Sequence, residues 1–593
     1  MSTQSHFKSD LRDVTFNLFE FLDSTRGSMD EGSIREVLST VDKLARNEIA
    51  ASFVEADREY PKQGPDGTPV LPAGLKKSIK AWQDGDWHRL ALREDLGGFG
   101  APLSVAWAAF ELVVGANASA GFYVFDTFIS GVIGEEGTQA QRDLYFPRYV
   151  DRRWGAAMVL TEPEAGSDVG QARTTARHVE GDVWEISGVK RFITNGDYDM
   201  PENIVHLVLA RPEGAKPGTK GLSMFIVPKF WVNPDGSLGE RNGMKCIGLE
   251  KKMGIKGSVT CEMEYGGDTP CRGLLVGEKH DGIRQMFRVI EGARMAIGFK
   301  SMSTVSTAYL NALAYAKERV QGPDLARAMD KKSPRVAIIR HPDVRRMLMR
   351  LKAHAQGMRA LCYYAADLAE QQDEKNADGK AAKLLDLMLP LVKGYCSDKG
   401  FELLGTALQV FGGSGYVQDH PIEQYLRDQK IDTIYEGTTH IQSLDLLFRK
   451  IARDGGTTLR GLLGQIQATV EAGTGGEGLA DARASLARAL GDMQSMLMTL
   501  MGLVGKSPYH AGFQGNRVLN ALAELVIGWL MVRHAAIAAE KLPAAKGDDV
   551  NYYMGKIATA RWFCREVLPT LTLTRKLVEQ SSLDLMELPD EAF

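Results

Sequence analysis

The chain has 593 residues, more than one hydrophobic core usually supports, so several domains are expected. Hydrophobic residues make up 44% and charged residues 25%, which is typical of a soluble globular protein, and the formal net charge of −4 argues against a general attraction to nucleic acid or anionic membranes. The six cysteines stand singly, with no CxxC pair. This pattern argues against structural zinc and a disulfide framework, and it favours buried thiols in a reducing compartment.

Two stretches bear on targeting. The first residues, MSTQSHFKSDLRD, lack the basic-then-apolar order of a signal peptide. The most apolar long stretch, VLNALAELVIGWLMV from Val518, contains Asn520 and Glu524 and is shorter than the ~20 residues that a membrane helix needs. We therefore predict a buried core helix there and a cytoplasmic protein.

Residues 1–155 predict a helical domain, because DLRDVTFNLFEFLD, SIREVLSTVDKLARNEIAASF and VAWAAFELVVGANASAGFYVF carry apolar residues at helical spacing. Residues 156–280 change pattern: ARHVEGDVWEISGVKRFITNG alternates apolar and polar residues and contains turn signals. This segment predicts a compact, antiparallel and barrel-like β domain.

Long helical patterns return in residues 281–450, for example in GIRQMFRVIEGARMAIGFKSMSTVSTAYLNALAYAKERV, and predict an antiparallel helix bundle. After the Gly-rich break AGTGGEG, residues 451–593 predict an extra helical domain. The expected fold class is therefore mainly α with a central β domain.

The stretch MVLTEPEAGSDVG places Thr161 at the end of an apolar strand and Ser167 and Asp168 in a Pro/Gly-rich turn. Turns of this kind expose N–H groups and hydroxyls that can bind a phosphate or the polar edge of a ring. An ordinary surface turn with local Asp and Ser hydrogen bonds explains the same residues and, taken alone, is the favoured interpretation.

In KRFITNG, Phe192 and Thr194 are two residues apart, so on a strand they face the same side. An aromatic ring and a hydroxyl on one face could support a planar cofactor, although a half-buried strand ending in an Asn-Gly turn is the favoured interpretation when the stretch is taken alone. The later QVFGGSGY lacks the GK[ST] of a P-loop and the strand–helix setting of a dinucleotide fingerprint. A generic nucleotide site is therefore a weak interpretation of that stretch.

In IDTIYEGTTHIQSLDLLF, Glu436 stands between Tyr435 and Gly437. The following Thr439 and Gln442 fit a capping box, and apolar residues then recur at helical spacing. Taken alone, Glu436 is an acid near a helix start, stabilised by roughly 0.3–1 kcal/mol of dipole attraction.

Taken together, TEPEAGSD, RFITNG, YAKERVQ, QVFGGSGY and RDQKIDTIYEGTTHIQ resemble the acyl-CoA dehydrogenase family in order and rough spacing, over about residues 35–450. The opening HFKSDLRDVTFNLFEFL and the tail ending DLMELPDEAF are similar to a long bacterial subgroup, which includes broad-range long-chain acyl-CoA dehydrogenases and methylthiopropionyl-CoA dehydrogenases. The family fold is an N-terminal helical domain, a β domain and a C-terminal four-helix bundle, in the order predicted above.

The resemblance implies FAD as cofactor, bound by the β domain and the bundle. The positions that match FAD contacts are Thr161, Ser167, Phe192, Thr194, Arg319, Gln409, Gly413 and Thr438. Gln409 and Gly413 would come from a neighbouring subunit, which implies a homodimer, with a tetramer as the alternative. Phe192 stands where many members have Trp.

Glu436 matches the catalytic base of the family, and Ser167, Arg294, Tyr435 and Gly437 match positions near the substrate. Some members carry the base at the position of Gly298 or Phe299, and the stretch ARMAIGFKSM has no acid there. After Arg319 the chain departs from ordinary members through a longer loop, VQGPDLARAMDKKSPRVAIIRHPDVRR, which leaves the FAD contacts of residues 320–335 open.

The implied reaction is α,β-dehydrogenation of a fatty acyl-CoA, the first step of β-oxidation. A carboxylate removes the α-proton, the β-hydride passes to flavin N5, and electrons go to electron-transferring flavoprotein. Hydrogen bonds to the thioester carbonyl stabilise the developing enolate. Burial would raise the pKa of Glu436 and the nearby helix start would lower it, so the direction of the shift stays open.

Three alternatives remain: an acyl-CoA oxidase that uses O₂, a nucleic-acid-binding relative of the family, and a non-catalytic helical scaffold. The acyl chain length is also open. Small residues of VVGANASAGFY would permit a deep pocket, and close helix packing explains them equally well; they are Gly115, Ala116, Ala118, Ala120 and Gly121.

Overall fold

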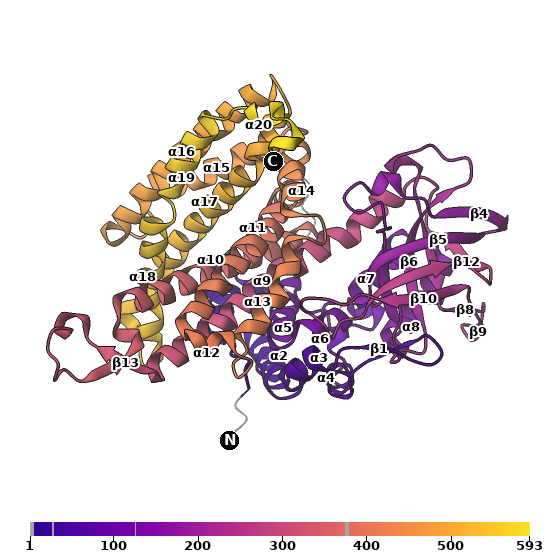
Figure 1. Ribbon diagram of the computed structural model, residues 1–593, viewed down its shortest axis with the longest axis horizontal. Coiled ribbons are helices and arrows are strands. Elements are labelled where there is room, and N and C mark those ends of the chain that lie inside the picture. Colours follow the sequence, from indigo (N-terminus) through magenta and orange to yellow (C-terminus); the bar gives the residue numbers. More distant parts are fainter. Residues whose placement is uncertain (1–4, 27–28, 125, 374–378) are drawn as a thin grey trace. The chain divides into compact units, whose positions relative to one another are not determined.

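In the computed structural model, the described residues are 5–26, 29–124, 126–373 and 379–593. They form two compact units (Figure 1). The first unit holds Glu36–Ala101 and Ala109–Ala293 with the described residues before Lys8, and the second holds Lys8–Arg35, Pro102–Ala108 and Arg294–Phe593. The fold class, mainly α with a central β domain, is confirmed. The finer division into four domains stays a prediction.

The helical part of the first unit precedes its sheet. It is built from α2 (Glu31–Leu44), α3 (Phe53–Arg58), α4 (Ala73–Asp84), α5 (Leu103–Ala116), α6 (Ala118–Tyr123), α7 (Asp126–Glu136) and α8 (Gln139–Arg152), with α2 and α5 contributing to both units. A small hairpin, β1 (Lys62–Gln63) with β2 (Pro69–Val70), interrupts the predicted helical segment. A capping box starts α8, where Thr138 and Gln141 satisfy each other's backbone N–H groups.

Eight strands form the sheet of the described residues, in the order β10-β11-β5-β12-β7-β6-β3, with β4 paired to β5 and β6. Most pairs are antiparallel, as predicted, but β3 pairs with β6 and β4 with β6 in parallel. The bounds are β3 (Gly155–Val159), β4 (Thr175–Glu180), β5 (Val183–Thr194), β6 (Ile204–Pro212), β7 (Ser223–Pro228), β10 (Met244–Leu249), β11 (Thr260–Tyr265) and β12 (Cys271–Leu275), beside the hairpin of β8 (Phe230–Val232) and β9 (Leu238–Arg241).

The continuous apolar run of β6 is explained by burial on both of its faces. Its side chains share a core with residues of α7 and α8, among them Ile133 and Tyr145. His206, the polar residue within the run, is also buried and hydrogen-bonds with the Tyr265 hydroxyl and the Gly196 carbonyl. The sheet therefore has a rigid centre from which the edge loops extend.

The second unit is helical. Its first three helices are long: α9 (Gly282–Glu318), α10 (Pro342–Asp373) and α11 (Lys380–Phe411). Three shorter helices follow them in the chain: α12 (Gly413–Tyr416), α13 (Ile422–Gln429) and α14 (Thr439–Leu444). The C-terminal helices are α15 (Thr457–Glu471), α16 (Ala480–Val504), α17 (Tyr509–Lys541), α18 (Asp548–Glu566), α19 (Thr570–Glu579) and α20 (Asp584–Glu587). Because α17 packs on α10, α11 and α14 as well as on α16 and α18, the extra helices share a core with the bundle.

The apolar stretch around Val518 lies within α17, which has 33 residues and is therefore longer than predicted. By length and composition alone this helix could cross a membrane. However, 83% of its most apolar window is buried inside the protein, as in the core helix of a soluble protein. The predicted core helix is confirmed, whereas the argument from its short length is wrong.

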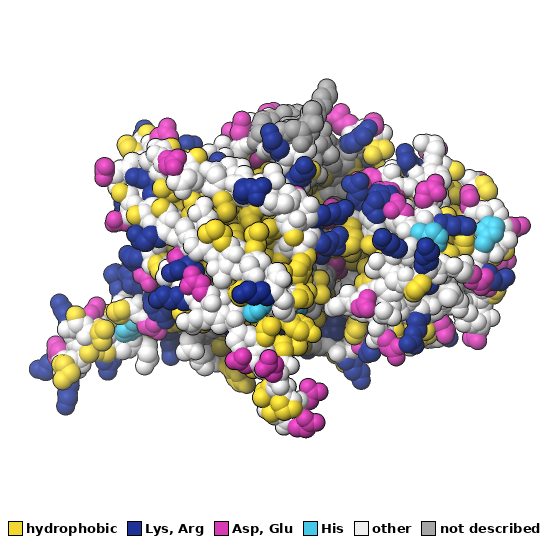
Figure 2. Space-filling model, turned by 90° about the horizontal axis from the view of Figure 1, so that it is seen from above, with side chains coloured by type: hydrophobic (Ala, Val, Ile, Leu, Met, Phe, Trp, Pro, Cys, Tyr) yellow, Lys and Arg dark blue, Asp and Glu magenta, His cyan; other side chains and the backbone are white. Residues whose placement is uncertain are grey.

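The long loop after Arg319 forms an antiparallel ribbon of β13 (Val320–Pro323) and β14 (Arg335–Ala337). Between its strands, Leu325 and Met329 are 66% and 97% exposed. Figure 2 shows this ribbon at the left, with Lys and Arg side chains along it. The insertion predicted from the sequence is thus an exposed ribbon of the second unit.

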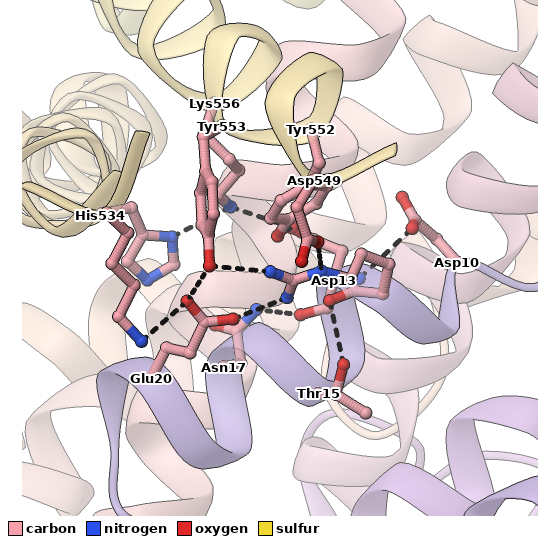
Figure 3. A network of polar contacts seen from close by, with 12 residues as sticks. Asp10, Asp13, Thr15, Asn17, Glu20, His534, Asp549, Tyr552, Tyr553 and Lys556 are labelled. Atoms are coloured by element: carbon pink, nitrogen blue, oxygen red, sulfur yellow. Dashed lines mark hydrogen bonds and ion pairs between the residues drawn. The ribbon is translucent and has the colours of Figure 1, made fainter. Parts of the chain in front are cut away.

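A buried polar network around Asp13 joins the first helix of the chain, α1 (Leu11–Thr15), to α10 and α18 (Figure 3). The Asp13 carboxylate accepts hydrogen bonds from Lys556 Nζ and the Tyr552 hydroxyl, both at 2.8 Å, and from Arg359 at 2.9 Å. Burial alone would raise the pKa of Asp13, but Lys556 and Arg359 hold that pKa well below its usual range. The network therefore anchors the N-terminal segment to the C-terminal helices.

Candidate active site

The predicted base stands in a turn with an unusual backbone. Glu436 and Gly437 lie between η11 (Lys430–Thr433) and α14 and have φ angles of +54° and +84°. The left-handed conformation costs a residue with a Cβ about 1 kcal/mol or more. Glycine tolerates it, so the strain falls on Glu436 and must be held by surrounding contacts.

Two side chains hold this turn through its carbonyl groups. Gln442 Nε2 donates hydrogen bonds to the carbonyl oxygens of Glu436 and Gly437, each at 3.0 Å. Lys393 Nζ, from the buried centre of α11, donates to the Gly437 carbonyl at 2.6 Å. The conformation of the turn is therefore fixed from the bundle side.

A second contact set holds the residue before the base. The Tyr435 hydroxyl donates to Asp432 Oδ1 at 2.8 Å, and Lys300 Nζ binds both oxygens of Asp432 at 2.8 Å. Lys300 and Asp432 are both buried. This ion pair is therefore desolvated, and it fixes Tyr435 and with it the start of the turn.

The Glu436 carboxylate itself accepts no hydrogen bond and forms no ion pair among the residues that the structure describes. Burial raises the pKa of Glu436, and Lys393 and Arg294 lower it in part. The sequence left the direction of this shift open, and burial outweighs the two cations. The carboxyl is thus a stronger base than an exposed glutamate.

The backbone N–H of Glu436 also lacks a protein acceptor within the described ranges. Arg294, predicted to lie near the base, influences its pKa and forms an ion pair at 2.7 Å with Asp445, the first residue of η12 (Asp445–Ile451). The turn therefore presents a carboxylate and an N–H donor together, which are the two groups that proton abstraction beside a carbonyl requires.

The predicted capping box is wrong, because the N-cap lies one residue earlier and Ile441, which has no side-chain acceptor, then stands at the third helical position. Thr438, not Thr439, is the N-cap of α14, and its hydroxyl oxygen accepts from Ile441 N–H at 3.3 Å. The Thr439 hydroxyl donates to Asp398, and the Gln442 side chain reaches the turn carbonyls. The Thr438 hydroxyl proton can still serve a ligand, because the cap uses only its oxygen.

The position used for the base in some relatives could not hold an acid in this chain. A Cβ at Gly298 would lie 2.2 Å from Val392 Cγ1. Phe299 is fully buried, with its ring centroid 5.1 Å from that of Trp107. Packing therefore excludes a carboxylate at either position.

In the first unit, an ion pair that sequence reasoning missed anchors the loop of Thr161 and Ser167. Glu162 accepts the backbone N–H groups of Arg173 and Thr174 at 2.6 and 3.0 Å and pairs with the buried Lys190 at 2.9 Å. Ser167 lies exposed in this loop, and Thr161 is half-buried. The loop is therefore held at its base while its tip is open.

Phe192 lies in a β-bulge, because Arg191 and Phe192 together oppose only Glu262 on β11. Its φ is +59° and its side chain is 55% exposed. Ile193 is buried, whereas Phe192 is exposed and Thr194 is partly exposed, and the bulge interrupts the regular alternation on which the prediction of a shared side rested. Since Arg191 N–H donates to the Thr161 carbonyl at 2.9 Å, the bulge and the Thr161 loop are neighbours.

Three predicted positions lie at another end of the second unit. Arg319 follows α9, Gln409 lies in the last turn of α11 and Gly413 starts α12. Tyr315 joins these ends, stacking on Phe411 with centroids 4.4 Å apart. In Figure 1, α12 and β13 lie far from α14. The structure therefore groups these positions with each other and not with Glu436.

The small residues around α6 serve close packing. A Cβ at Gly121 would lie 2.5 Å from Val114 Cγ1, and Ala118 and Ala120 are buried. A Cβ at Gly257 would lie 2.7 Å from Ala56 and 3.0 Å from Ser119. Of the two interpretations of these residues, the contacts favour helix packing.

The two residues that hold the turn carbonyls, Lys393 and Gln442, were not assigned to the site from the sequence. A signal was present for Lys393, which interrupts the apolar run MLPLVKGYC. A lysine in a buried helix needs a partner, and here the partner is a backbone carbonyl.

Comparison with known proteins places these residues in a family. Residues 157–266 match the acyl-CoA dehydrogenase middle domain, and residues 280–450 match the acyl-CoA dehydrogenase C-terminal domain. Residues 462–589 match the domain described as acetyl-CoA dehydrogenase C-terminal like. The matches thus cover most of the sheet, the bundle and most of the C-terminal helices.

Full-length relatives agree. The chain is 48% identical over 611 residues to a broad-specificity linear acyl-CoA dehydrogenase of Mycobacterium tuberculosis, covering 99% of this chain and all of that one. It is 39% identical to 3-methylmercaptopropionyl-CoA dehydrogenase of Ruegeria pomeroyi, over 85% of each. An acyl-CoA dehydrogenase from Bacillus anthracis complexed with FAD has the same fold, with a TM-score of 0.72, 22% identity, and coverage of 94% of this chain and 90% of that one. The chain therefore belongs to the acyl-CoA dehydrogenase family and is an FAD-dependent oxidoreductase that acts on CH–CH bonds of acyl-CoA thioesters.

Proposed function

We propose that this enzyme converts fatty acyl-CoA to trans-2-enoyl-CoA, the first step of β-oxidation, with Glu436 as the base that removes the α-proton. The observation that carries the proposal is the environment of Glu436. Its carboxylate has no protein partner in the described part of the chain, and burial raises its pKa. A basic carboxylate without a competing partner is suited to proton abstraction.

The α-proton of a thioester is too weakly acidic for a carboxylate alone. The backbone N–H of Glu436 is a donor available for the thioester carbonyl, and a hydrogen bond there would stabilise the charge that develops as the proton leaves. Tyr435 is fixed by its hydrogen bond to Asp432, and its ring would help to exclude water beside the turn once the substrate is bound. One short segment thus supplies the base, the donor and an apolar wall.

The residues of the first unit fit the flavin of FAD. Phe192 presents an exposed aromatic face on its bulge, and the hydroxyls of Thr161 and Thr194 can bond the edge of a planar ring. Ser167 lies in an open loop tip that can reach a phosphate or CoA. When bound, FAD accepts the β-hydride at flavin N5.

The positions of Arg319, Gln409 and Gly413 support the prediction that FAD is bound by residues of two neighbouring subunits. Arg294 and Arg319 both belong to the α9 region and are 25 positions apart, which corresponds to about 37 Å along a helix. We therefore assign Arg319, Gln409 and Gly413 to the FAD whose flavin lies in another copy, and Thr438 to the FAD of its own copy. This assignment requires a homodimer or a tetramer of dimers.

The decisive test is Glu436→Gln, studied by anaerobic stopped-flow reduction of the flavin with an acyl-CoA. We expect retained FAD, retained acyl-CoA binding and a loss of at least ~100-fold in reduction rate. Glu477→Gln changes an exposed glutamate on the C-terminal helices and serves as the control. Near-normal flavin bleaching by the Glu436 variant would disprove the assignment.

Two further measurements define the reaction. Reoxidation of the reduced flavin by electron-transferring flavoprotein but not by air supports a dehydrogenase, whereas rapid reoxidation in air assigns an acyl-CoA oxidase. Acyl-CoAs from four to eighteen carbons, assayed with an artificial acceptor, define the chain length. Because α6 is closely packed, we expect the rate to fall before the longest chains. Cell fractionation tests the predicted cytoplasmic location.

A further inference from the structure

We propose that Lys393 is a positioning residue for the base: its ammonium group holds the Gly437 carbonyl, and thereby keeps the strained turn of Glu436 in its productive conformation without binding the carboxylate. The proposal rests on the proposed role of Glu436. The carrying observation is the 2.6 Å hydrogen bond from Lys393 Nζ to the Gly437 carbonyl oxygen.

The geometry makes Lys393 a rigid support. It lies in the middle of α11, fully buried, and its own carbonyl accepts a hydrogen bond from the Ser397 hydroxyl at 2.6 Å. Gln442 binds the same Gly437 carbonyl from α14. Two helices therefore converge on one oxygen, which is the kind of over-determination that a left-handed residue with a Cβ requires.

A lysine is a costly choice for this task, because a buried ammonium loses its hydration. A neutral amide could make the same hydrogen bond, as Gln442 does. We therefore expect the positive charge of Lys393 to have an electrostatic effect in addition to the hydrogen bond. The Glu436 carboxylate can sense this charge, since Lys393 and Glu436 each affect the pKa of the other, although the Asp432 carboxylate influences the pKa of Lys393 more strongly.

The charged groups around the turn come from four elements, and most are paired. Arg294 of α9 is paired with Asp445 of η12, and Lys300 of α9 is paired with Asp432 of η11. Asp398 of α11 accepts from Thr439, and burial raises the pKa of Asp398. Lys393 forms no ion pair with any described residue, and Asp432 and Glu436 are the carboxylates that most favour its charged form.

The protonation states follow from burial. Burial lowers the pKa of Lys393 to about 8, and the carboxylates of Asp432 and Glu436 oppose this shift. The group is therefore mainly an ammonium at pH 7. That ammonium lowers the pKa of Glu436, which burial raises, and so it favours the ionised base at neutral pH.

Replacing Lys393 with Met removes both the donor and the charge. We expect flavin reduction at pH 7 to slow by about tenfold or more, because the turn is no longer held from α11. The pH at half-maximal reduction rate should move upward by about one unit, since an opposite charge beside a carboxylate shifts its pKa by at least that much. Lys393→Arg restores a charged donor and should recover part of the rate and the original pH profile.

The experiment is anaerobic stopped-flow reduction of the holoenzyme across pH 5.5–9, with acyl-CoA binding titrated separately. Lys556→Met is the matched control: it removes another buried lysine of the same unit, in the network of Figure 3, and should lower the melting temperature without moving the pH profile. If that variant is insoluble, Tyr552→Phe in the same network replaces it.

The outcomes separate the two proposals. A Lys393→Met enzyme that keeps FAD and substrate binding but reduces slowly with an upward-shifted profile supports the positioning role. An unshifted profile, or a rate loss explained by loss of FAD, overturns it and leaves Lys393 structural. If Glu436→Gln reduces normally, the base assignment fails whatever the Lys393 variants do.

Discussion

The second unit contains two carboxylate sites, the fully buried Asp13 and the half-buried Glu436, that are built from the same residue types and reach opposite results. Asp13 and Glu436 each lie near one lysine and one arginine. At Asp13 both cations contact the carboxylate, and its pKa is lowered. At Glu436 the lysine binds a backbone carbonyl and the arginine is paired with Asp445, and the pKa is raised.

The comparison shows that a nearby cation does not by itself lower the pKa of a desolvated carboxylate. The direction of the pKa shift depends on whether the cation binds the carboxylate or another acceptor. A carboxylate with satisfied oxygens is held as an anion and contributes to stability. A carboxylate whose neighbouring cations are held elsewhere stays basic and available for chemistry. The backbone agrees with this division, because Asp13 lies in a regular helix and Glu436 in a left-handed turn.

The largest expected effect comes from breaking the stability site. Asp13→Asn leaves Lys556 and Arg359 buried without their anion, so we expect a loss of about 3–5 kcal/mol in the free energy of unfolding, measured by denaturant titration. Asp549→Asn removes an ion pair at the exposed rim of the same network and should cost no more than about 1 kcal/mol. Equal losses in the two variants would contradict the comparison.

The next effect tests the strained turn. Gly437 has φ +84°, and a Cβ there would lie 2.9 Å from Gln442 Nε2, so Gly437→Ala should disturb the clamp and slow flavin reduction about tenfold. Gly547→Ala is the control, because that glycine is left-handed too but has no atom within 4 Å of its added Cβ. Both variants should lose about 1 kcal/mol of stability, while only the first loses rate.

The pH dependence of stability should carry opposite signs at the two sites. The lowered pKa of Asp13 contributes stability that is present above its unfolded value of about 3.9 and is lost as the pH falls through the folded pKa. The raised pKa of Glu436 means that stability falls as the pH rises from about 4.3 to the folded value. Melting temperatures of Asp13→Asn and Glu436→Gln, compared with the parent protein from the lowest pH at which it stays folded up to pH 8, measure the two contributions, and slopes of equal sign in the two windows would refute the assignment.

The smallest effect concerns the left-handed residue of the first unit. Phe192→Gly relieves the backbone strain, so the melting temperature of the FAD-free protein should not fall, whereas FAD binding should weaken about threefold or more through loss of the aromatic face. Phe192→Trp keeps a ring and should keep FAD. A drop in stability without a change in FAD content would make Phe192 a structural residue.

Much of the site was predictable where a motif is short and local. Tyr435, Glu436 and Gly437 follow each other in the chain, and the position of Arg294 on a long helix follows from its helical spacing. The error at the N-cap has a local cause: two consecutive threonines precede the helix, and only the backbone angles decide that Thr438 is the cap. The parallel pairing of β3 with β6 was missed because period-two alternation does not report strand direction.

By itself, the sequence determined the order of helical and β segments and the buried nature of the stretch around Val518, because periodicity is a local property, and its contiguous motifs pointed to Glu436 as the proposed base. Only the tertiary structure decided which cations reach which acceptors. Lys393 and Glu436 are 43 positions apart, and Asp13 and Lys556 are 543 apart. No local pattern links residues at such separations, and burial, which sets the sign of each pKa shift, exists only once the helices have packed.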